Sequence, residues 1–390
     1  MHIVSKIEIS TNNLFHKQLS QLFLIQFLSK IIKQITQLYQ MEQEEDKKKL
    51  LEQSLFGQCR FIGEFTQIHQ LGEGTFGKVY KAQDKKNNEI VAVKQVKIHD
   101  EREGFPVTSV REIKLLSELQ NHPNIVQFKE VVVGQNQNSI FLIFEYCQMD
   151  IANLIFRMDQ EREYFSESEI KCIILQLLNG VQHMHKQYQM HRDIKLSNVL
   201  INDKGVVKIA DFGLAREYNK PNKPYTPKVV TLWYRSPELL LEMEQYTTSI
   251  DIWSVGCVLA ELLNKGQPIF PGDTEMKQFQ LICELIGYPT RYEWNEYYSQ
   301  VKKEVRKELE KFSGFKTNNL QKQLKCSENC LKLLQKMLAW DPKKRISAEK
   351  AMSHPYFSEN PKPTLPGQIK ILERLNYYAK KNQEAQERKK

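Results

Sequence analysis

The chain has 390 residues, of which 41% are hydrophobic and 26% are charged, so it can form a globular fold with a sizeable core. Its formal net charge is +9, and the densest basic runs, residues 302–307 and 387–390, contain no aromatic residue. Because nucleic-acid sites combine basic and stacking side chains, we expect these runs to be solvated faces and expect no direct nucleic-acid binding.

The seven cysteines are scattered, and an odd number argues against a disulfide framework. We therefore expect a reducing compartment, the nucleus and/or the cytoplasm. Cys326 and Cys330 form the one close pair, but they lack the neighbouring His or Cys cluster that a zinc site needs. No uninterrupted apolar stretch approaches the roughly 20 residues that cross a bilayer, so no membrane association is expected.

Residues 1–64 precede the part of the chain that has a strand pattern. Residues 22–39 are apolar with polar residues at helical intervals, which predicts an amphipathic helix. Met41 opens a highly charged stretch that is typical of a natural chain start. We expect residues 1–40 to be either an appended helix or a segment that is absent from the expressed protein.

Residues 65–146 read as a small antiparallel sheet with one helix. Apolar residues alternate at 79–82 and 90–93 on either side of a polar turn at 84–88, which predicts a β-hairpin. Residues 108–119 have a helical pattern, and residues 125–133 and 139–146 have strand patterns.

Beyond Asp150 the periodicity becomes helical, which predicts a larger, mainly helical lobe. The short junction at 146–150 would serve as a hinge, and ligands usually lie in the cleft between lobes. The fold class expected is α+β and bilobal, with a small lobe at 65–146, a large lobe at 147–357 and a basic tail at 358–390 that is partly helical or disordered. The helices predicted in the large lobe are 151–158, 167–188, 250–263, 276–285 and 330–338.

A glycine loop lies between the first two predicted strands. The run 71–79 has the spacing Gly-x-Gly-x-x-Gly-x-Val, and glycines allow the backbone to close over phosphate oxygens. Alone this is a weak signal, because a hairpin that binds no ligand can carry the same glycines. A dinucleotide-binding turn is disfavoured, since it requires a helix after the glycines and residues 79–82 are a strand.

Lys94 and Glu112 strengthen the signal. Lys94 ends the run Val-Ala-Val-Lys on the next strand, where a cation can contact the α- and β-phosphates of a nucleotide. Glu112 lies in the predicted helix and can pair with Lys94. Either residue alone would be unremarkable.

Residues 191–198 read His-Arg-Asp-Ile-Lys-Leu-Ser-Asn, and residues 211–213 read Asp-Phe-Gly. This is the spacing of a kinase catalytic loop followed by a magnesium-binding motif. Asp193 would accept the proton of the attacking hydroxyl, and Lys195 would neutralise charge on the transferred phosphoryl group. Asn198 and Asp211 would supply oxygen ligands for Mg²⁺.

With these motifs the chain resembles the eukaryotic protein kinases from about residue 57 to 357. Ser236-Pro237-Glu238, the run 251–256 and the run 341–345 support the resemblance, which implies that Glu238 pairs with Arg345 and that Glu238 and Asp251 are structural. It also implies phosphoryl transfer from ATP, with Mg²⁺, to protein serine or threonine.

Within that family the chain resembles the cyclin-dependent kinases. The run 106–112 is similar to their cyclin-contacting helix, and the run 226–235 to their activation segment. Together with 57–60 and 131–134, these runs are closest to the cyclin-dependent kinase ten and PITSLRE-like subgroup. The resemblance implies a cyclin partner and a glutamate helix that stays displaced, with little activity, until the cyclin binds.

The resemblance assigns further roles to residues by position. Thr226 would be phosphorylated by an activating kinase, and Arg111, Arg192 and Arg216 would bind its phosphate. Val230 and Arg235 would shape a pocket for the proline in Ser-Pro or Thr-Pro substrates. Phe144 would line the adenine pocket, the backbones of Glu145 and Cys147 would bond adenine, and Asp150 would bond the ribose. The remaining nucleotide contacts implied are Leu71, Gly72, Glu73, Gly74, Thr75, Gly77, Val79, Ala92, Lys94, Lys195, Asn198 and Asp211.

Two departures and two alternatives remain. The glycine loop has Thr75-Phe76 where many cyclin-dependent kinases have Thr-Tyr, so inhibition by tyrosine phosphorylation is absent, and residues 159–163 are a polar lengthening that we interpret as a surface loop. A MAP kinase would share most motifs, but its activation segment carries Thr-x-Tyr, and here Thr226 is followed by Pro227 and Lys228. A catalytically weak scaffold would be expected to lack Lys94, Asp193 or Asp211. Cell-cycle and transcriptional roles both stay open.

Overall fold

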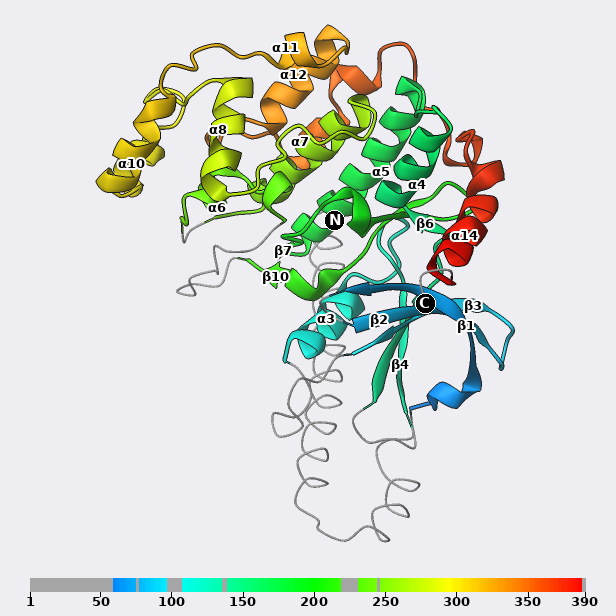
Figure 1. Cartoon of the computed structure of the whole chain (residues 1–390). Helices are drawn as coiled ribbons and strands as arrows, with labels where there is room; N and C mark the ends of the chain where they lie inside the picture. Colours follow the sequence, from blue (N-terminus) through cyan, green and yellow to red (C-terminus); the bar gives the residue numbers. More distant parts are fainter. Residues whose placement is uncertain are drawn as a thin grey trace, which may run out of the picture.

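The computed structural model describes residues 59–74, 77–96, 107–134, 139–218, 231–243 and 246–387. These residues form a small sheet-containing lobe and a larger helical lobe, which confirms the predicted α+β, bilobal fold (Figure 1). The helix predicted at 22–39 lies outside the described residues. Within the described ranges, no helix has the length and hydropathy needed to cross a membrane.

The small lobe is one antiparallel sheet in the order β1-β2-β3-β5-β4. Val91 and Val93 on β3 are buried between partly exposed neighbours, and they pack with Val132 and Ile143 into the core of this lobe. Helix α3 packs against β4 and carries Glu112 toward the sheet. The elements are β1 (Phe65–Gly74), β2 (Gly77–Asp84), β3 (Ile90–Gln95), α3 (Val107–Glu118), β4 (Phe128–Val133) and β5 (Ile140–Glu145).

Arg60 links the segment before β1 to the strands β2 and β4 through ion pairs. Its guanidinium bonds both carboxylate oxygens of Asp84, at 2.6 and 2.7 Å, where β2 ends. It also contacts Glu64 at 2.9 Å and Glu130 of β4 at 3.0 Å. The Asp84 side chain is only 7% exposed, and the bonds from Arg60 hold its pKa below the usual value. This pair therefore ties the start of the domain to the sheet.

The large lobe is helical, with short strands around the catalytic loop. Its helices are α4 (Ile151–Gln160), α5 (Glu167–Lys186), α6 (Pro237–Leu240), α7 (Ser249–Leu263), α8 (Glu275–Ile286), α9 (Asn295–Gln300), α10 (Lys303–Leu309), α11 (Leu320–Gln323), α12 (Glu328–Met337), α13 (Ala348–Met352) and α14 (Leu372–Glu387). Its strands are β6 (Met149–Asp150), β7 (Gln189–Met190), β8 (Val199–Ile201), β9 (Val207–Ile209) and β10 (Arg216–Glu217). Its short 3-10 turns include η4 (Leu196–Asn198), η5 (Phe212–Leu214) and η6 (Leu232–Tyr234).

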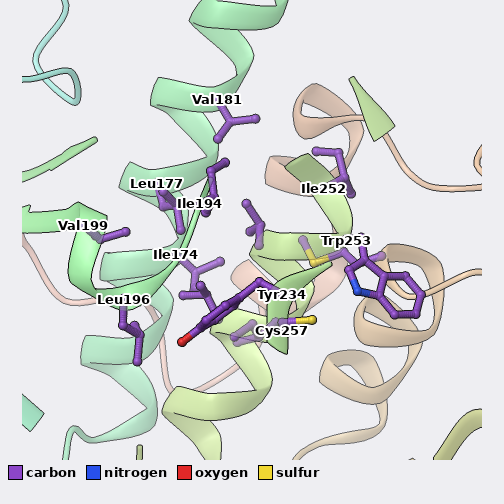
Figure 2. Close-up of a cluster of buried hydrophobic side chains, with 14 of the residues drawn as sticks. Ile174, Leu177, Val181, Ile194, Leu196, Val199, Tyr234, Ile252, Trp253 and Cys257 are labelled. Carbon is purple, nitrogen blue, oxygen red and sulfur yellow. The ribbon is translucent and has the colours of Figure 1, made fainter. Parts of the chain in front are cut away.

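The core of this lobe lies between α5 and α7 and includes the catalytic loop. Figure 2 shows Ile194 of that loop beside Leu177 of α5, with Leu196 of the loop and Cys257 of α7 in the same cluster. Helix α7 is buried on nearly all sides, which fits its mostly apolar sequence. The expected Glu238–Arg345 pair is present, with two bonds of 2.5 and 2.7 Å between buried groups.

The six helices predicted from periodicity between residues 108 and 338 are all present, with ends within two residues of those expected, and the seventh, at 22–39, lies outside the described residues. Apart from α14, the remaining helices and the short strands of the large lobe were not predicted, because each spans too few residues to show a period. The segment expected as a partly helical or disordered tail forms α14, and Leu375 and Tyr378 on it are 0% and 1% exposed.

Candidate functional site

The buried carboxylate of Asp251 holds the catalytic loop in place. Asp251, at the first turn of α7, accepts bonds from the backbone N–H groups of His191 (3.0 Å) and Arg192 (2.9 Å) and contacts His185 Nε2 at 2.9 Å. Burial raises the pKa of Asp251, but these donors outweigh it and hold the pKa below the usual value. An ionised carboxylate therefore fixes the loop, including Arg192 in its left-handed conformation (φ 67°).

Apolar and polar residues alternate along this loop. Ile194 and Leu196 are 1% and 3% exposed, and they point into the core shown in Figure 2. Because successive side chains of extended backbone point to opposite sides, burying these two directs Asp193 and Lys195 away from the core. Hydrophobic packing thus sets the orientation of the reactive side chains.

Asp193 lies at the centre of a polar cluster. Asn198 donates from Nδ2 to its backbone oxygen (2.8 Å) and to Oδ2 (3.0 Å), and Lys195 Nζ lies 2.7 Å from the same Oδ2. Thr231 donates to Oδ1 from both its backbone N–H (3.0 Å) and its hydroxyl (2.9 Å), and the hydroxyl accepts from Lys195 Nζ at 2.8 Å. The cluster orients one carboxylate and one ammonium at the same point, as a proton acceptor beside a charge-neutralising cation requires.

Lys94 joins the two lobes. Its Nζ lies 2.7 Å from Glu112 Oε1 on α3 and 3.4 Å from Asp211 Oδ1, which precedes η5. Burial lowers the pKa of Lys94, but the carboxylates of Glu112 and Asp211 outweigh this and raise it above the usual value, so the ammonium stays charged. The displaced helix expected for the isolated chain is not what the structure has. Pairing outweighs the desolvation of the Lys94 ammonium, whereas burial still raises the pKa of Glu112 above its usual value despite the pair.

Asp211 has a left-handed backbone conformation, with φ 63° and ψ 77°. The next residue, Phe212, is 1% exposed and packs edge-on against the His191 ring at 5.1 Å between centroids. His191 Nε2 in turn contacts the backbone oxygen of Ala210 at 3.0 Å. These contacts hold Asp211 in a conformation that costs free energy, and they turn its carboxylate toward Lys94.

The glycine loop and β3 form the small-lobe side of the site. Gly74 pairs with Gly77 where β1 meets β2, and Gly77 has φ 141°, which favours glycine. A Cβ on Gly72 would meet no protein atom within 4 Å, so protein packing does not require glycine there. The missing side chain leaves room for a phosphate beside the backbone. Leu71 and Val79 are partly buried and Glu73 is exposed, whereas Thr75 lies outside the described residues.

The hinge supplies the apolar side of the site. Phe144 is buried on β5, pairs with Ala92 of β3, and packs against Phe128 at 5.7 Å. Burial raises the pKa of the Cys147 thiol to about 12, so it remains protonated. Asp150 accepts bonds from the backbone N–H (2.8 Å) and side-chain amide (2.7 Å) of Asn153 and so caps α4.

Glu145, the last residue of β5 before the hinge, is held by Gln127 and by Lys208 of β9. Its carboxylate accepts from the Gln127 backbone N–H at 2.6 Å and pairs with Lys208 at 2.7 Å. Its backbone N–H bonds the Gln127 oxygen at 2.9 Å. The Glu145 side chain is thus occupied by protein contacts, and any bond from this residue to adenine would come from its backbone.

Asn198 and Asp211 fit the needs of Mg²⁺ bound with a nucleotide. Because the Asn198 amide nitrogen faces Asp193, its oxygen is the atom that can ligate a metal. Among the described residues there is no cluster of three or more His, Cys, Asp or Glu that could hold a metal ion by itself. A pair of oxygen donors suits Mg²⁺, which usually takes its other ligands from phosphates and water.

The residues expected for regulation and substrate binding are only partly described. Thr226, Val230 and the side chain of Arg111 lie outside the described residues. Arg192 is 2% exposed and bonds the Leu214 oxygen (2.8 Å) and the Tyr246 hydroxyl (2.6 Å). Arg216 bonds the Ala215 oxygen at 2.8 Å.

The described end of the run 226–235, from residue 231 on, is fixed by two acids. Arg235 pairs with Glu275 of α8 at 2.7 Å, and the Tyr234 hydroxyl donates to Glu261 of α7 at 2.7 Å. Burial raises the pKa of Glu261 to about 7. Sequence reasoning had not assigned Thr231 or Glu261 to the site. For Thr231 the available signal was a hydroxyl residue four positions before Arg235, whereas nothing in the sequence marks Glu261.

Comparison with known proteins agrees with this geometry. The protein kinase domain family matches residues 65–357. The chain is 48% identical to Cyclin-dependent kinase 10 of Homo sapiens over 311 residues, which is 80% of this chain and 84% of that protein. It is 47% identical to Cyclin-dependent kinase 11 of Dictyostelium discoideum, over 80% of this chain and 85% of that protein. It is 45% identical to Serine/threonine-protein kinase PITSLRE of Drosophila melanogaster, over 79% of this chain and 32% of that protein.

Proposed function

Because the chain belongs to the protein kinase family, and within it to the cyclin-dependent kinases, we propose that it phosphorylates Ser-Pro and Thr-Pro sequences as a cyclin complex. The observation that carries the proposal is the convergence of Lys195, Asn198 and Thr231 on Asp193. The nucleotide substrate proposed is ATP, with Mg²⁺ as the metal.

The chemistry proposed is direct transfer. The substrate oxygen bonds the γ-phosphorus as the bond to the β,γ-bridging oxygen breaks, ADP leaves, and the hydroxyl proton moves to Asp193. Lys195 neutralises charge on the transferred group, and Lys94 holds the α- and β-phosphates. Bound Mg²⁺ supplies further charge neutralisation, held by Asn198 and Asp211.

A cyclin would act on α3. The Lys94–Glu112 pair is formed in the single chain at 2.7 Å, so we propose that a cyclin increases the fraction of molecules with α3 in this position rather than creating a new contact. The cyclin requirement then reflects the free energy of holding α3 against the sheet.

Phosphorylation of Thr226 is proposed as the second requirement. Arginine side chains form short, charge-assisted bonds to phosphate, and Arg216 pairs with Met190, two residues before Arg192, so both arginines lie at the same end of the β7–β10 pair. With Arg111 they would neutralise the phosphate and order the activation segment.

The preference for proline is proposed from Val230 and Arg235. Proline has no backbone N–H, so a pocket without an acceptor at that point accepts proline and penalises other residues. Arg235 is held by Glu275 at 2.7 Å, which supports a fixed pocket wall. A role in cell-cycle or transcription control, in the nucleus and/or the cytoplasm, is proposed on the same family basis.

The test is transfer from ATP to paired peptides that differ only in Pro or Ala after the phosphorylated serine. The purified chain is assayed alone and with each cyclin that co-purifies with it. We expect transfer to the Ser-Pro peptide only in the complex, and Asp211→Asn should abolish it. Equal transfer to both peptides would reject the proline preference, and transfer that survives Asp211→Asn would reject the assigned site.

A further inference from the structure

The segment that follows the kinase domain is bonded along the start of α5 before it forms α14. Lys171 of α5 is fully buried, and its Nζ donates to the backbone oxygen of Pro361 at 2.8 Å. The Thr364 N–H donates to the Ser168 backbone oxygen at 3.1 Å. A buried ammonium is costly unless it is paired, and Lys171 also pairs with Glu167 at 3.5 Å and Glu359 at 3.8 Å, so its bond to Pro361 is one of several contacts that hold this segment in place.

The same segment also makes a close backbone approach to the β8–β9 turn. Gly205 in that turn has φ +72°, and a Cβ there would lie 2.0 Å from the backbone oxygen of Pro366. No other residue type fits without moving one of the two backbones. Glycine at position 205 therefore allows the backbone of the β8–β9 turn to lie against the backbone of this segment.

Helix α14 then docks on residues 161–163, directly after α4. Ile371, directly before the helix, and Leu375 and Tyr378 on it are spaced at i, i+4 and i+7 and are all 5% exposed or less, so they form one buried side. The Tyr378 hydroxyl donates to Glu161 at 2.8 Å.

Charge pairing on the rim of this contact supports the docking. Arg374 pairs with both Glu161 and Glu163, the second at 2.6 Å. The polar lengthening expected as a surface loop and the segment expected as a tail are thus two halves of one interface.

From there α14 reaches the small lobe. It contacts α4 and also β1, and Figure 1 shows it running from beside α4 to the sheet. Helix α4 begins at Asp150, its N-cap, and β1 carries Gly72 and Gly74. The chain connects its lobes at the hinge, residues 146–150, Lys94 links them through Glu112 and Asp211, and α14 is a further connection on the side of α4 and β1.

We propose that α14 is an intramolecular strap that limits opening of the two lobes and so retains bound nucleotide, with Arg374 and Tyr378 as positioning residues. The inference rests on the proposed function only in taking ATP as the nucleotide. A strap of this kind lowers the population of the open form, from which nucleotide dissociates, and does not touch the reacting groups.

The first test is Tyr378→Asp in the full chain, which places a charge beside Glu161. Binding of a fluorescent ADP analogue with Mg²⁺ should weaken by about threefold or more through faster dissociation. In the cyclin complex the KM for ATP should rise by a similar factor, while kcat and the KM for peptide stay within about twofold. The matched control is Tyr377→Asp, because Tyr377 is 50% exposed on the same helix.

The second test reverses the charges. Arg374→Glu should weaken nucleotide binding as Tyr378→Asp does, and adding Glu161→Arg and Glu163→Arg should restore it. A purely structural role would lower the fraction of chains that bind and leave the dissociation constant unchanged.

The outcomes separate this inference from the proposed function. Unchanged nucleotide affinity in Arg374→Glu, with hydrogen exchange showing α14 released, would overturn the strap. If Arg374→Glu weakens nucleotide affinity while the wild-type chain transfers no phosphate, the strap is kept and the kinase proposal is rejected, because the binding measurement needs neither a cyclin nor transfer.

Discussion

Replacing Thr231 with valine removes one hydroxyl from the Asp193 cluster and keeps the side chain's shape. The hydroxyl donates to Asp193 Oδ1 at 2.9 Å and accepts from Lys195 Nζ at 2.8 Å, whereas the Thr231 backbone N–H still donates to Oδ1 at 3.0 Å. The variant therefore loses two bonds to charged groups and retains one.

The magnitude follows from those contacts. A hydrogen bond to a charged group contributes about 1.5–3 kcal/mol, and the direct contact of 2.7 Å between Lys195 and Asp193 persists. We therefore count the loss as one such bond, which corresponds to about 10- to 150-fold in rate. Thr231→Ser keeps the hydroxyl and should stay within about threefold of wild type.

The assay measures kcat and KM for ATP and for a Ser-Pro peptide with the purified cyclin complex. The loss should fall on kcat, because Thr231 orients the groups that act on the reacting atoms. If Thr231→Val transfers phosphate within about threefold of wild type, the hydroxyl does not position Asp193 and the reasoning is wrong.

Three further predictions concern stability and regulation. Arg60→Met should lower the free energy of unfolding by about 3 kcal/mol, since it leaves the buried Asp84 unpaired, while Lys129→Met, which removes an exposed pair with Glu89, should cost about 0.5 kcal/mol or less by urea titration. The Arg60–Asp84 contribution should be present above the usual aspartate pKa and lost at lower pH, because the folded-state pKa of Asp84 is lowered. Glu261 has the opposite sign: its folded-state pKa is about 7 against a usual value of 4.5, so its contribution falls as pH rises between these values, and Glu261→Gln should flatten stability over that window. Thr226→Ala should lose most kinase activity in the cyclin complex, and equal activity would reject the phosphorylation requirement.

The sequence predicts those helices and strands that are long enough to show a hydrophobic period. Helix α5 has 20 residues and a capping box in which Ser166 and Glu169 bond each other's backbone, so both its face and its start are encoded locally. Short elements such as β7 and β10, with two residues each, form only because distant segments meet.

The site residues likewise divide into those that a local sequence motif identifies and those that only long-range contacts bring to the site. Asp193, Asn198 and Asp211 are recognisable because chemistry fixes their types and spacing. Thr231 and Glu261 act through contacts across 38 and 27 positions of sequence, and no local pattern reports such a contact. The docking of α14 is the extreme case, because Glu161 and Tyr378 are 217 positions apart.

The backbone conformation of Asp211 affects which inactive variant is a fair control. Asparagine tolerates left-handed geometry almost as well as aspartate, whereas alanine there costs about 1–2 kcal/mol. Asp211→Asn should therefore remove the negative charge and leave the loop in place. Asp211→Ala would also relax the backbone and displace Phe212. A protein partner that fails to bind the alanine variant could then be wrongly taken as one whose binding depends on catalysis.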